Sequence, residues 1–304
     1  MSCTVNNLHR PLLRHIFTIA AIAGLAACGG GGSTTGPSVS NMAGVGAAYS
    51  KTFTVNIAGT SLNQGVTVTT EPGCGAMTLA SGGTDTQQSF TCTLNAVGTV
   101  TSRVRNLDGV EIARVKVEVP LPQVTMTMTQ VASGGTATGT IVVELDPVNA
   151  PITVNNFLAY VNGTAGFYKN TLFHRAEAGV VIQAGGFTSS LTPKTTGLLP
   201  PIVLESNNGL KNVRGTIGAA RGSDPNSATS QFYFNLADNT GFDYVDANNP
   251  GYAVFGKIVS GQDIADKIGN VEVAEVVING SNPPATLKNV PVNEVRITAI
   301  SQTK

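Results

Sequence analysis

The segment FHRAEAGVVIQAGGF, residues 173–187, is mostly apolar but contains Arg175 near its start and Gln183 in its second half. The chain is poor in charge, so an arginine within a core strand needs a structural or functional reason. Side chains alternate between the two faces of a strand, so Arg175 and Gln183 share a face only if no bulge intervenes. Arg175 therefore has two interpretations: a functional residue, or a strand residue in an ion pair with Glu177 or Glu205.

Upstream of this segment, the hydrophobic period changes after the strand-like run TIVVELD. In APITVNNFLAYVNG, apolar residues recur at i, i+3, i+4 and i+7 from Val154 to Val161, which is typical of one helix face. Pro151 suits the first turn of such a helix and Gly163 suits its end. The pattern predicts a helix between these two residues.

A second helix is predicted by SGQDIADKIGN. Ser260 and Asp263 have the spacing of a capping box, Ile264 and Ile268 lie one turn apart, and Gly269 ends the pattern. The other apolar runs are short and β-like. Two helices among many short strands indicate a mainly β fold with a closed or nearly closed antiparallel barrel.

Three long segments occur in a recognisable order: GFYKNTLFHRAEAGVVIQAGGF (166–187), NGLKNVRGTIGAARGSDPNSATSQFYFNLADNTGFD (208–243) and GYAVFGKIVSGQDIADKI (251–268). Together they resemble the cyclophilin-type peptidyl-prolyl cis–trans isomerases, closest to their bacterial periplasmic branch. The resemblance covers nearly all of residues 123–304. It implies an eight-stranded antiparallel barrel capped by two helices and an activity that needs no cofactor and no metal.

The resemblance also gives Arg175 a role. An X–Pro bond rotates over a barrier of roughly 18–20 kcal/mol because amide resonance resists twisting. As the bond twists, the prolyl nitrogen gains a lone pair, and a guanidinium offers fixed, permanently charged donors to it. In the family, the arginine of FHR has this catalytic role and the glutamine of the next strand orients it. Arg175 and Gln183 match these positions.

The same resemblance predicts a set of substrate-binding residues. They are Phe173, Val180, Val181, Ala220, Arg221, Gln231, Tyr233, Phe242 and Tyr252. Gln231 either binds the peptide backbone or satisfies a neighbouring loop as an ordinary strand residue. His174 is expected to support the core, because rotation about the bond requires no proton abstraction.

The expected proline pocket departs from the family pattern. Val180 and Val181 stand where Phe and Met are common, and Tyr233 stands where Phe is common. The wall position often occupied by Trp falls at Gly241, and Tyr252 replaces the common His. Each buried CH2 contributes roughly 0.8 kcal/mol, so we expect a wider pocket that holds proline more weakly. Cyclosporin binding is the family property most affected.

Residues 45–122 form a predicted all-β module. VTVTT, SFTCTLN and IARVKVEV alternate apolar and polar residues, and Asp108-Gly109 between two such runs indicates a hairpin turn. Pro120 and Pro122 mark the boundary with the second domain, residues 123–304. The segment resembles a small bacterial immunoglobulin-like module.

Cys74 and Cys92 both lie in this module. In an exported protein, two such cysteines are expected to form a disulfide. Their close spacing is unlike that of the inter-sheet bridge of antibody domains. We therefore expect a bridge between neighbouring strands or across a loop.

The N-terminus has the pattern of an export signal. Residues 1–27 combine a basic start with a short apolar run that ends in LAA, and Cys28 follows directly. This resembles the lipobox of bacterial lipoproteins, in which the cysteine is acylated; the alternative is an ordinary signal peptide with an incidental cysteine. Residues 28–44 are predicted to be a flexible Gly/Ser-rich tether. By the same resemblance, Gly29 favours the outer membrane, with the protein facing the periplasm.

Three functions are compatible with the sequence. The first is an isomerase that acts on proline-containing segments of exported proteins while anchored to the membrane through lipid. The second is a catalytically weak or inactive member that binds peptides or an envelope partner. The third makes the N-terminal module a docking or adhesion unit. Because the formal net charge is zero, no nucleic-acid partner is expected.

Overall fold

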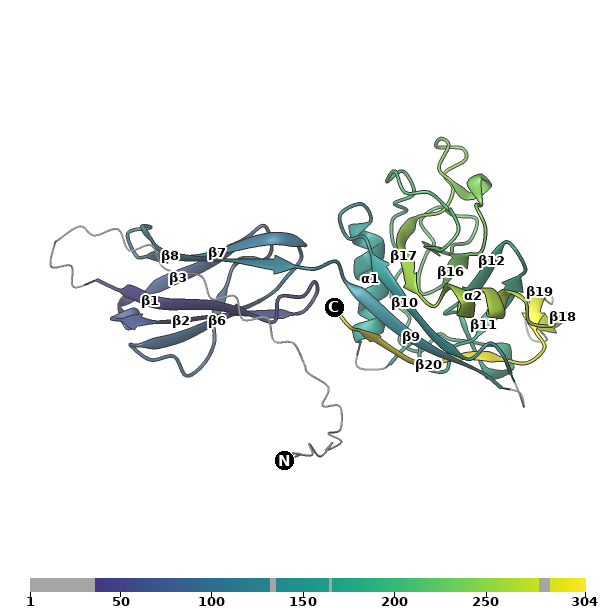
Figure 1. The fold of residues 1–304 in the computed structure, drawn as a ribbon. Coiled ribbons are helices and arrows are strands. Elements are labelled where there is room, and N and C mark those ends of the chain that lie inside the picture. The colour runs from purple at the N-terminus through teal and green to yellow at the C-terminus, as the bar shows by residue number, and fades with distance from the viewer. Residues whose placement is uncertain (1–35, 132–134, 164–165, 279–284) are drawn as a thin grey trace, which may run out of the picture.

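A computed structural model describes residues 36–131, 135–163, 166–278 and 285–304. They form two β-rich parts joined by a short connection (Figure 1). The predicted signal peptide (residues 1–27), Cys28 and the first part of the predicted tether lie outside the described residues. Within those described residues, every helix is too short or too polar to cross a membrane.

The N-terminal part is a sandwich of two four-stranded antiparallel sheets. The sheet orders are β1-β2-β6-β5 and β4-β3-β7-β8. The strands are β1 (Ser38–Val45), β2 (Thr52–Thr60), β3 (Val66–Glu71), β4 (Gly75–Ala76), β5 (Thr78–Leu79), β6 (Gln87–Thr93), β7 (Gly98–Asn106) and β8 (Glu111–Val119). Lettered along the chain, they have the ABED and C′CFG arrangement of immunoglobulin-type sandwiches. The prediction of an all-β immunoglobulin-like module is confirmed.

The start of the module differs from the sequence prediction. The Gly- and Ser-rich composition predicts a tether up to residue 44, yet β1 begins at Ser38 and pairs with β2 along its length. Met42 of β1 is buried in the module core. The backbone hydrogen bonds to β2 and this one buried side chain order a segment whose composition alone indicates flexibility.

The predicted disulfide between Cys74 and Cys92 is present, with a Cα–Cα distance of 6.1 Å. Cys74 lies in the turn between β3 and β4, whereas Cys92 lies on β6 of the other sheet. The chain passes from one sheet to the other between β4 and β5, which brings the turn close to β6. The bridge therefore runs from a turn of one sheet to a strand of the other. Of the two expected arrangements, the link between neighbouring strands is wrong, whereas a bridge that starts in a loop is found.

The C-terminal part is built on one eight-stranded antiparallel sheet with the order β11-β12-β16-β15-β17-β10-β9-β20. Its strands are β9 (Gln123–Gln130), β10 (Gly139–Leu145), β11 (Phe173–Glu177), β12 (Val181–Ala184), β15 (Thr216–Ala219), β16 (Phe232–Asn235), β17 (Val254–Ser260) and β20 (Val295–Gln302). An isolated bridge pairs Leu172 with Arg296 of β20. Because this bridge joins the two edges, the sheet nearly closes, which confirms the predicted eight-stranded barrel.

The first helix, α1 (Pro151–Asn162), has the predicted bounds, with Gly163 as its C-cap. Its first turn leaves backbone N–H groups without partners inside the helix. The Glu205 carboxylate accepts hydrogen bonds from the N–H groups of Ile152 and Thr153, at 3.0 and 2.7 Å. Glu205 therefore stabilises the helix N-terminus rather than pairing with Arg175.

The second helix, α2 (Gln262–Gly269), begins differently from the prediction. Its N-cap is Gly261 with φ +86°, and no side chain caps it. A Cβ at Gly261 would collide with the backbone of Thr140, so a glycine is needed there. Asp263 pairs with Lys267 instead, at 3.1 Å. The predicted capping box is therefore wrong, because close contact with β10 determines how the chain enters the helix.

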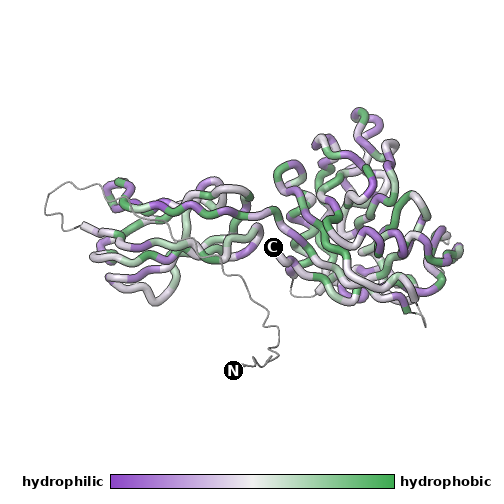
Figure 2. The backbone as a smooth tube through the Cα atoms, in the orientation of Figure 1, coloured by the Kyte–Doolittle hydropathy of each residue, from purple (hydrophilic) through white to green (hydrophobic). Residues whose placement is uncertain are grey.

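An aromatic cluster fills the barrel beneath α1. The ring of Phe157 lies 5.4 Å from that of Tyr168, 5.5 Å from that of Phe232 and 5.3 Å from that of Phe255. Figure 2 shows apolar and polar stretches alternating along the chain in both parts. Burying each such side chain contributes about 1.5–3 kcal/mol, so this cluster holds the strands that carry the site described below.

Two small hairpins and three 3-10 turns complete the described structure. They are β13 (Phe187–Thr188) with β14 (Thr192–Pro193), β18 (Val273–Ile278) with β19 (Ala285–Pro291), and the turns Leu62–Gln64, Ser189–Leu191 and Thr240–Phe242. Hydrogen bonds also link the two parts: Tyr49 donates to Asn155 of α1 at 2.8 Å, and Gln302 of β20 donates to the backbone carbonyl of Tyr49, also at 2.8 Å. Because Tyr49 lies in the loop between β1 and β2, this loop contacts the barrel.

Candidate active site

The β11–β12 hairpin brings Arg175 and Gln183 together. They are direct partners across the two antiparallel strands, so their side chains project from the same face of the pair. The register shifts between Phe173 and Arg175. This shift comes before the Arg175–Gln183 pair, so it leaves the alignment of the pair intact. The sequence alone leaves open whether the two side chains meet, and this register places them side by side.

Arg175 and Gln183 line a cavity of about 260 Å³. The full lining is Arg175, Val181, Gln183, Ala220, Arg221, Tyr233, Phe242 and Tyr252. Every one of these residues belongs to the set that the sequence resemblance predicts. They come from β11, β12, β16 and the loops after β15 and before β17, so the cavity exists only in the folded barrel.

Three aromatic rings form one wall of the cavity. The ring of Tyr233 lies 6.1 Å from those of both Phe242 and Tyr252, which lie 5.4 Å apart. All three pairs meet edge to face, which is a favoured aromatic geometry. The rings are apolar and mutually braced, so they form a surface suited to a small apolar ring.

The Tyr233 hydroxyl is held within the wall. It donates a 2.6 Å hydrogen bond to Oδ1 of Asn212, a buried side chain. A Cβ at Gly218, its neighbour on β15, would collide with the Tyr233 ring and hydroxyl. Burial raises the pKa of Tyr233 well above its usual value. The extra hydroxyl therefore fits because Gly218 leaves room and Asn212 accepts its hydrogen bond.

Arg221 is held by hydrogen bonds to the backbone and by contact with an aromatic ring. Its Nε and Nη2 donate to the carbonyl of Gly251 at 3.1 and 2.8 Å, and its Nη1 donates to the carbonyl of Gly222 at 2.9 Å. Its guanidinium carbon also lies 4.6 Å from the centre of the Tyr252 ring, within the range of a cation–π interaction. These contacts fix the aromatic wall and use most of the donors of Arg221.

Arg175 is less constrained. It pairs with Glu177, its neighbour on the same face of β11, as one of the two sequence interpretations expected. This contact uses one nitrogen, Nη2, and a guanidinium has five N–H donors. Gln183 donates through Nε2 to Oε1 of Gln231 at 2.9 Å. The hairpin therefore presents a positioned guanidinium beside the cavity, and four of its N–H donors bond to no residue in the described part of the chain.

His174 lies behind this pair and remains uncharged at neutral pH. It is buried, and its ring lies 4.8 Å from that of Phe187. Burial lowers the pKa of His174 to about 4. Its Nδ1 atom has no hydrogen-bond partner in the part of the chain that the structure describes. This placement agrees with the expected supporting role of the residue.

Three of the predicted substrate-binding residues lie outside the cavity lining. Phe173 is buried in the barrel core against Phe232 and Phe234, because the register shift after it turns its side chain inward. Val180 lies in the β11–β12 turn, where its backbone carbonyl accepts hydrogen bonds from Leu236 and Asn239. Gln231 precedes β16 and bonds to Gln183, but it does not line this cavity.

Sequence reasoning missed Asn212 and Gly218. Both shape the wall through Tyr233, but neither carries reactive chemistry. No pattern in the sequence indicates that residue 212 lies against residue 233, since the contact depends on the closure of the barrel. The replacement of Phe by Tyr at 233 was the available signal, because a buried hydroxyl requires a hydrogen-bond acceptor.

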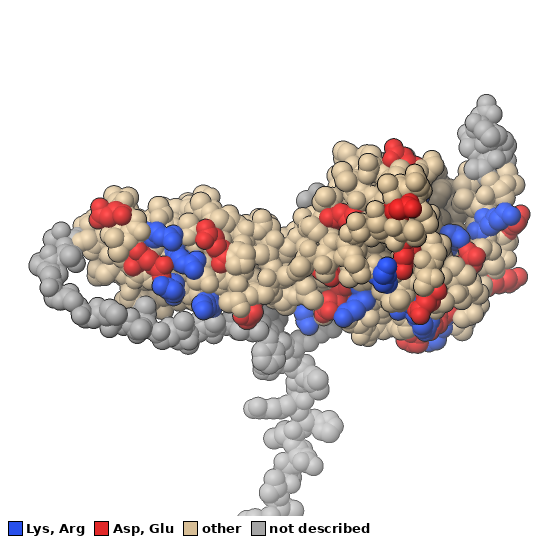
Figure 3. All heavy atoms as spheres, turned by 90° about the horizontal axis from the view of Figure 1, so that it is seen from above, with Lys and Arg blue, Asp and Glu red and all other residues tan. Residues whose placement is uncertain are grey.

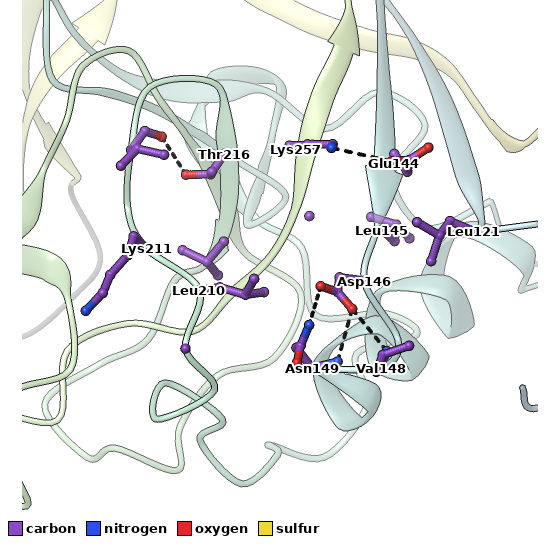
Figure 4. A pocket seen from close by; sticks show the side chains of 14 residues that line it. Leu121, Glu144, Leu145, Asp146, Val148, Asn149, Leu210, Lys211, Thr216 and Lys257 are labelled. Atoms are coloured by element: carbon purple, nitrogen blue, oxygen red, sulfur yellow. Dashed lines mark hydrogen bonds and ion pairs between the residues drawn. The ribbon is translucent and has the colours of Figure 1, made fainter. Parts of the chain in front are cut away.

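A larger cavity, of about 550 Å³, lies elsewhere on the barrel and shares no lining residue with the first. Figure 4 shows that two of its carboxylates, Glu144 and Asp146, have partners among the residues drawn. Lys257 lies 3.7 Å from Glu144, and Asp146 accepts bonds from the Asn149 side chain and from two backbone N–H groups. Its size alone does not make it a reaction site, because these charged groups already have partners.

Charge and metal-ligand patterns add little to the site. On the face seen in Figure 3, acidic and basic side chains are interspersed over both parts of the molecule. Among the residues with described positions, no group of three or more His, Cys, Asp or Glu side chains is placed to hold a metal ion.

Comparison with known proteins agrees with this geometry. Residues 125–302 match the family model described as cyclophilin type peptidyl-prolyl cis-trans isomerase. Peptidyl-prolyl cis-trans isomerase A of Dickeya dadantii is 48% identical over 141 residues, which cover 46% of this chain and 72% of that protein. A peptidyl-prolyl cis-trans isomerase of Acinetobacter baylyi is 43% identical over 157 residues, covering 52% and 81%.

Among solved structures, a cyclophilin type isomerase of Cryptosporidium parvum aligns with 60% of this chain and 98% of its own, at a TM-score of 0.45 and 22% identity. The family model spans more than half of the chain, and the bacterial relatives align over most of their own length. The chain therefore belongs to the cyclophilin-type peptidyl-prolyl cis-trans isomerase family.

Proposed function

We propose that this chain catalyses the cis–trans isomerisation of X–Pro bonds in exported polypeptides. One observation carries the proposal: Arg175 and Gln183 lie side by side at an aromatic-walled cavity of about 260 Å³. The proline ring enters the cavity against Val181, Ala220 and the aromatic wall. The peptide bond before the proline then lies next to the guanidinium.

In the proposed mechanism, Arg175 acts on the twisted amide. Resonance gives the planar X–Pro bond its barrier of roughly 18–20 kcal/mol. A hydrogen bond from the guanidinium to the prolyl nitrogen forms fully only when the nitrogen loses conjugation. The interaction is therefore stronger in the transition state than in either planar isomer, which is the condition for catalysis. No proton is transferred and no covalent bond is made or broken.

The two glutamines position this donor and the substrate. Gln183 is bonded to Gln231, so its amide plane is held beside Arg175. The pair of amides retains donor and acceptor atoms that a peptide backbone can engage. Glu177 fixes the other side of the guanidinium. Because these groups are already positioned, binding of the substrate costs less conformational entropy.

The test of catalysis is Arg175→Ala in a peptide isomerisation assay. Loss of a transition-state donor typically costs about 10²–10³ in rate, so we expect kcat/KM on a short X–Pro peptide to fall by about that factor. Arg114→Ala is a matched control, because Arg114 is an exposed, ion-paired arginine on the sandwich. A wild-type protein that does not exceed the uncatalysed rate would refute the proposal.

We further propose that the protein acts in the cell envelope, anchored by acylation of Cys28. The lipobox-like sequence before Cys28 and the disulfide between Cys74 and Cys92 support this location, because disulfides persist in oxidising compartments. Acylation with two or more chains would give stable anchoring. Cys28→Ser should move the protein from the membrane fraction to the soluble periplasmic fraction, and unchanged membrane association would exclude this anchor.

Peptide or partner binding without efficient catalysis is the second candidate. It is favoured by the position of Val180 in the turn, outside the cavity, which leaves Val181 as the only side chain from the turn region in the described lining. A smaller contact area holds proline more weakly. Measurable peptide affinity with no acceleration of isomerisation would support this candidate over the enzyme.

A further inference from the structure

A second groove adjoins the proposed proline cavity. It has a volume of about 550 Å³ and is lined by His174, Arg175, Glu177, Gln183, Phe187, Gln231 and by Thr286, Leu287, Lys288 and Asn289. Arg175 and Gln183 line both spaces. A peptide with its proline in the smaller cavity therefore passes the Arg175–Gln183 pair and meets the groove within one or two residues, since successive Cα atoms are about 3.8 Å apart.

The outer wall of this groove is the β18–β19 hairpin. Within the described residues, β18 and β19 pair only with each other, and Figure 1 shows them at the edge of the barrel beside β11. An isolated two-stranded hairpin is marginally stable in water. In this protein, β19 packs against β11 of the barrel, and Val290 of β19 is buried. The wall is thus a fixed part of the fold.

The groove is suited to an uncharged side chain. Phe187 and Leu287 are its large apolar residues and are both half-buried. Its charges are balanced by neighbours, because Arg175 pairs with Glu177, and Lys288 lies 3.6 Å from Glu275. The buried imidazole of His174 contributes a neutral surface, since burial lowers its pKa to about 4. The volume lies within the range of ligand-binding pockets.

We propose that this groove binds the residue adjacent to the substrate proline and selects a bulky apolar side chain there, with Leu287 and Phe187 as its contacts. The proposal rests on the proposed isomerase function, because it assigns the second binding subsite of the same site. The β18–β19 hairpin then determines substrate specificity: it selects which X–Pro bonds are isomerised and leaves Arg175 and Gln183 unchanged.

The test uses short peptides with Phe, Gly or Glu at the position before the proline, and a second series with these residues after it. In one of the two series, we expect wild-type kcat/KM to be about tenfold higher for Phe than for Gly, with Glu no better than Gly. Leu287→Ala should remove most of this preference and leave the Gly peptide unaffected. Val277→Ala on the partner strand is the matched control, because Val277 is exposed and does not line the groove.

Two further measurements distinguish a failure of the proposed subsite from a failure of the proposed isomerase function. Leu287→Trp fills the groove and should depress turnover of the Phe peptide while the Gly peptide still reports an intact barrel. Equilibrium binding of the same fluorescent peptides gives a readout that does not depend on catalysis. Equal responses of the Phe and Gly peptides in wild type, or equal losses on both in Leu287→Ala, would overturn the subsite. Selective binding without turnover would instead retain the subsite and refute the isomerase proposal.

Discussion

Arg175 and Arg221 lie on two different walls of one cavity, and their surroundings differ. On the hairpin wall (Arg175, Val181 and Gln183), the arginine contacts one carboxylate, and its other N–H groups bond to none of the described residues. On the aromatic wall (Arg221, Tyr233, Phe242 and Tyr252), the arginine directs its donors to two backbone carbonyls and packs on a ring.

This difference indicates that the two walls have different roles. A donor already bonded in the resting state cannot gain much when the substrate amide twists, whereas an unused donor can. Under the proposed function, catalysis then belongs to the hairpin wall and the holding of proline to the aromatic wall. In the larger cavity of Figure 4, Glu144 and Asp146 likewise have partners, Lys257 and Asn149. The proposed reaction site therefore rests on the Arg175 guanidinium and not on cavity size.

The largest expected effect separates stability from catalysis at His174, which lies behind the hairpin wall. The pKa of His174 falls from 6.5 to about 4 on folding because the side chain is buried. Between these values the unfolded chain binds more protons, so the stability contributed by neutral His174 is complete above pH 6.5 and is lost as pH falls toward 4. The loss amounts to about 3 kcal/mol. Urea unfolding of wild type and His174→Gln across this range measures it.

Isomerase activity of the folded protein should not follow this titration, because the mechanism transfers no proton. A His174→Gln variant whose stability depends on pH as strongly as that of wild type would contradict the assignment of this loss to His174.

The next effect tests the packing of the aromatic wall. Gly218→Ala places a methyl group against the Tyr233 ring and hydroxyl, and overpacking of this kind typically costs about 1–3 kcal/mol. Tyr233→Phe in the same chain should restore part of the loss, because it removes the crowded hydroxyl. Gly241→Ala is the control, since a Cβ at that position would meet no atom within 4 Å among the described residues. Additive losses in the double variant, measured by thermal unfolding, would argue against this contact.

A smaller effect contrasts the two arginines directly. Arg221→Ala frees the Gly251 carbonyl and the Tyr252 ring, so we expect a KM increase of about tenfold, or about 1.4 kcal/mol, with kcat little changed. Arg175→Ala should instead act mainly on kcat. Steady-state kinetics on one peptide distinguish the two, and a kcat loss in Arg221→Ala as large as that in Arg175→Ala would remove the proposed division between the walls.

The smallest effect concerns Glu177, which pairs with Arg175 on the same strand, β11. The pair is partly exposed, and such pairs contribute about 0.2–1 kcal/mol. Glu177→Gln keeps a hydrogen-bond acceptor while removing the charge, so kcat should fall by no more than about fivefold. A loss approaching that of Arg175→Ala would mean that Glu177 acts on the substrate itself.

Much of the fold could be predicted from the sequence, since the strand alternation, the first helix bounds and the order of three long motifs all agree with the barrel. The errors have local physical causes. The shift in register after Phe173 turns that side chain into the core, because faces alternate with a period of two residues. Tertiary contact with Thr140, rather than local capping, sets the start of α2. At Ser38, strand pairing overrides a composition typical of linkers.

The candidate site was predictable where the motif is contiguous. Arg175 and Gln183 lie on one hairpin, so their partnership follows once the register is known. Asn212 and the groove wall formed by Thr286 to Asn289 join the site through closure of the barrel. Nothing in the sequence around these residues indicates their neighbours, because the contacts are made between segments far apart in the chain.

Exchange NMR on an isotopically labelled X–Pro peptide tests the central claim most directly, because it reports binding and bond rotation in one sample. We expect wild type to accelerate the exchange between cis and trans peaks. Arg175→Ala should still shift the peptide resonances on binding, yet leave exchange near the uncatalysed rate, which takes tens to hundreds of seconds. Exchange in Arg175→Ala at the wild-type rate would contradict the assignment of catalysis to this guanidinium.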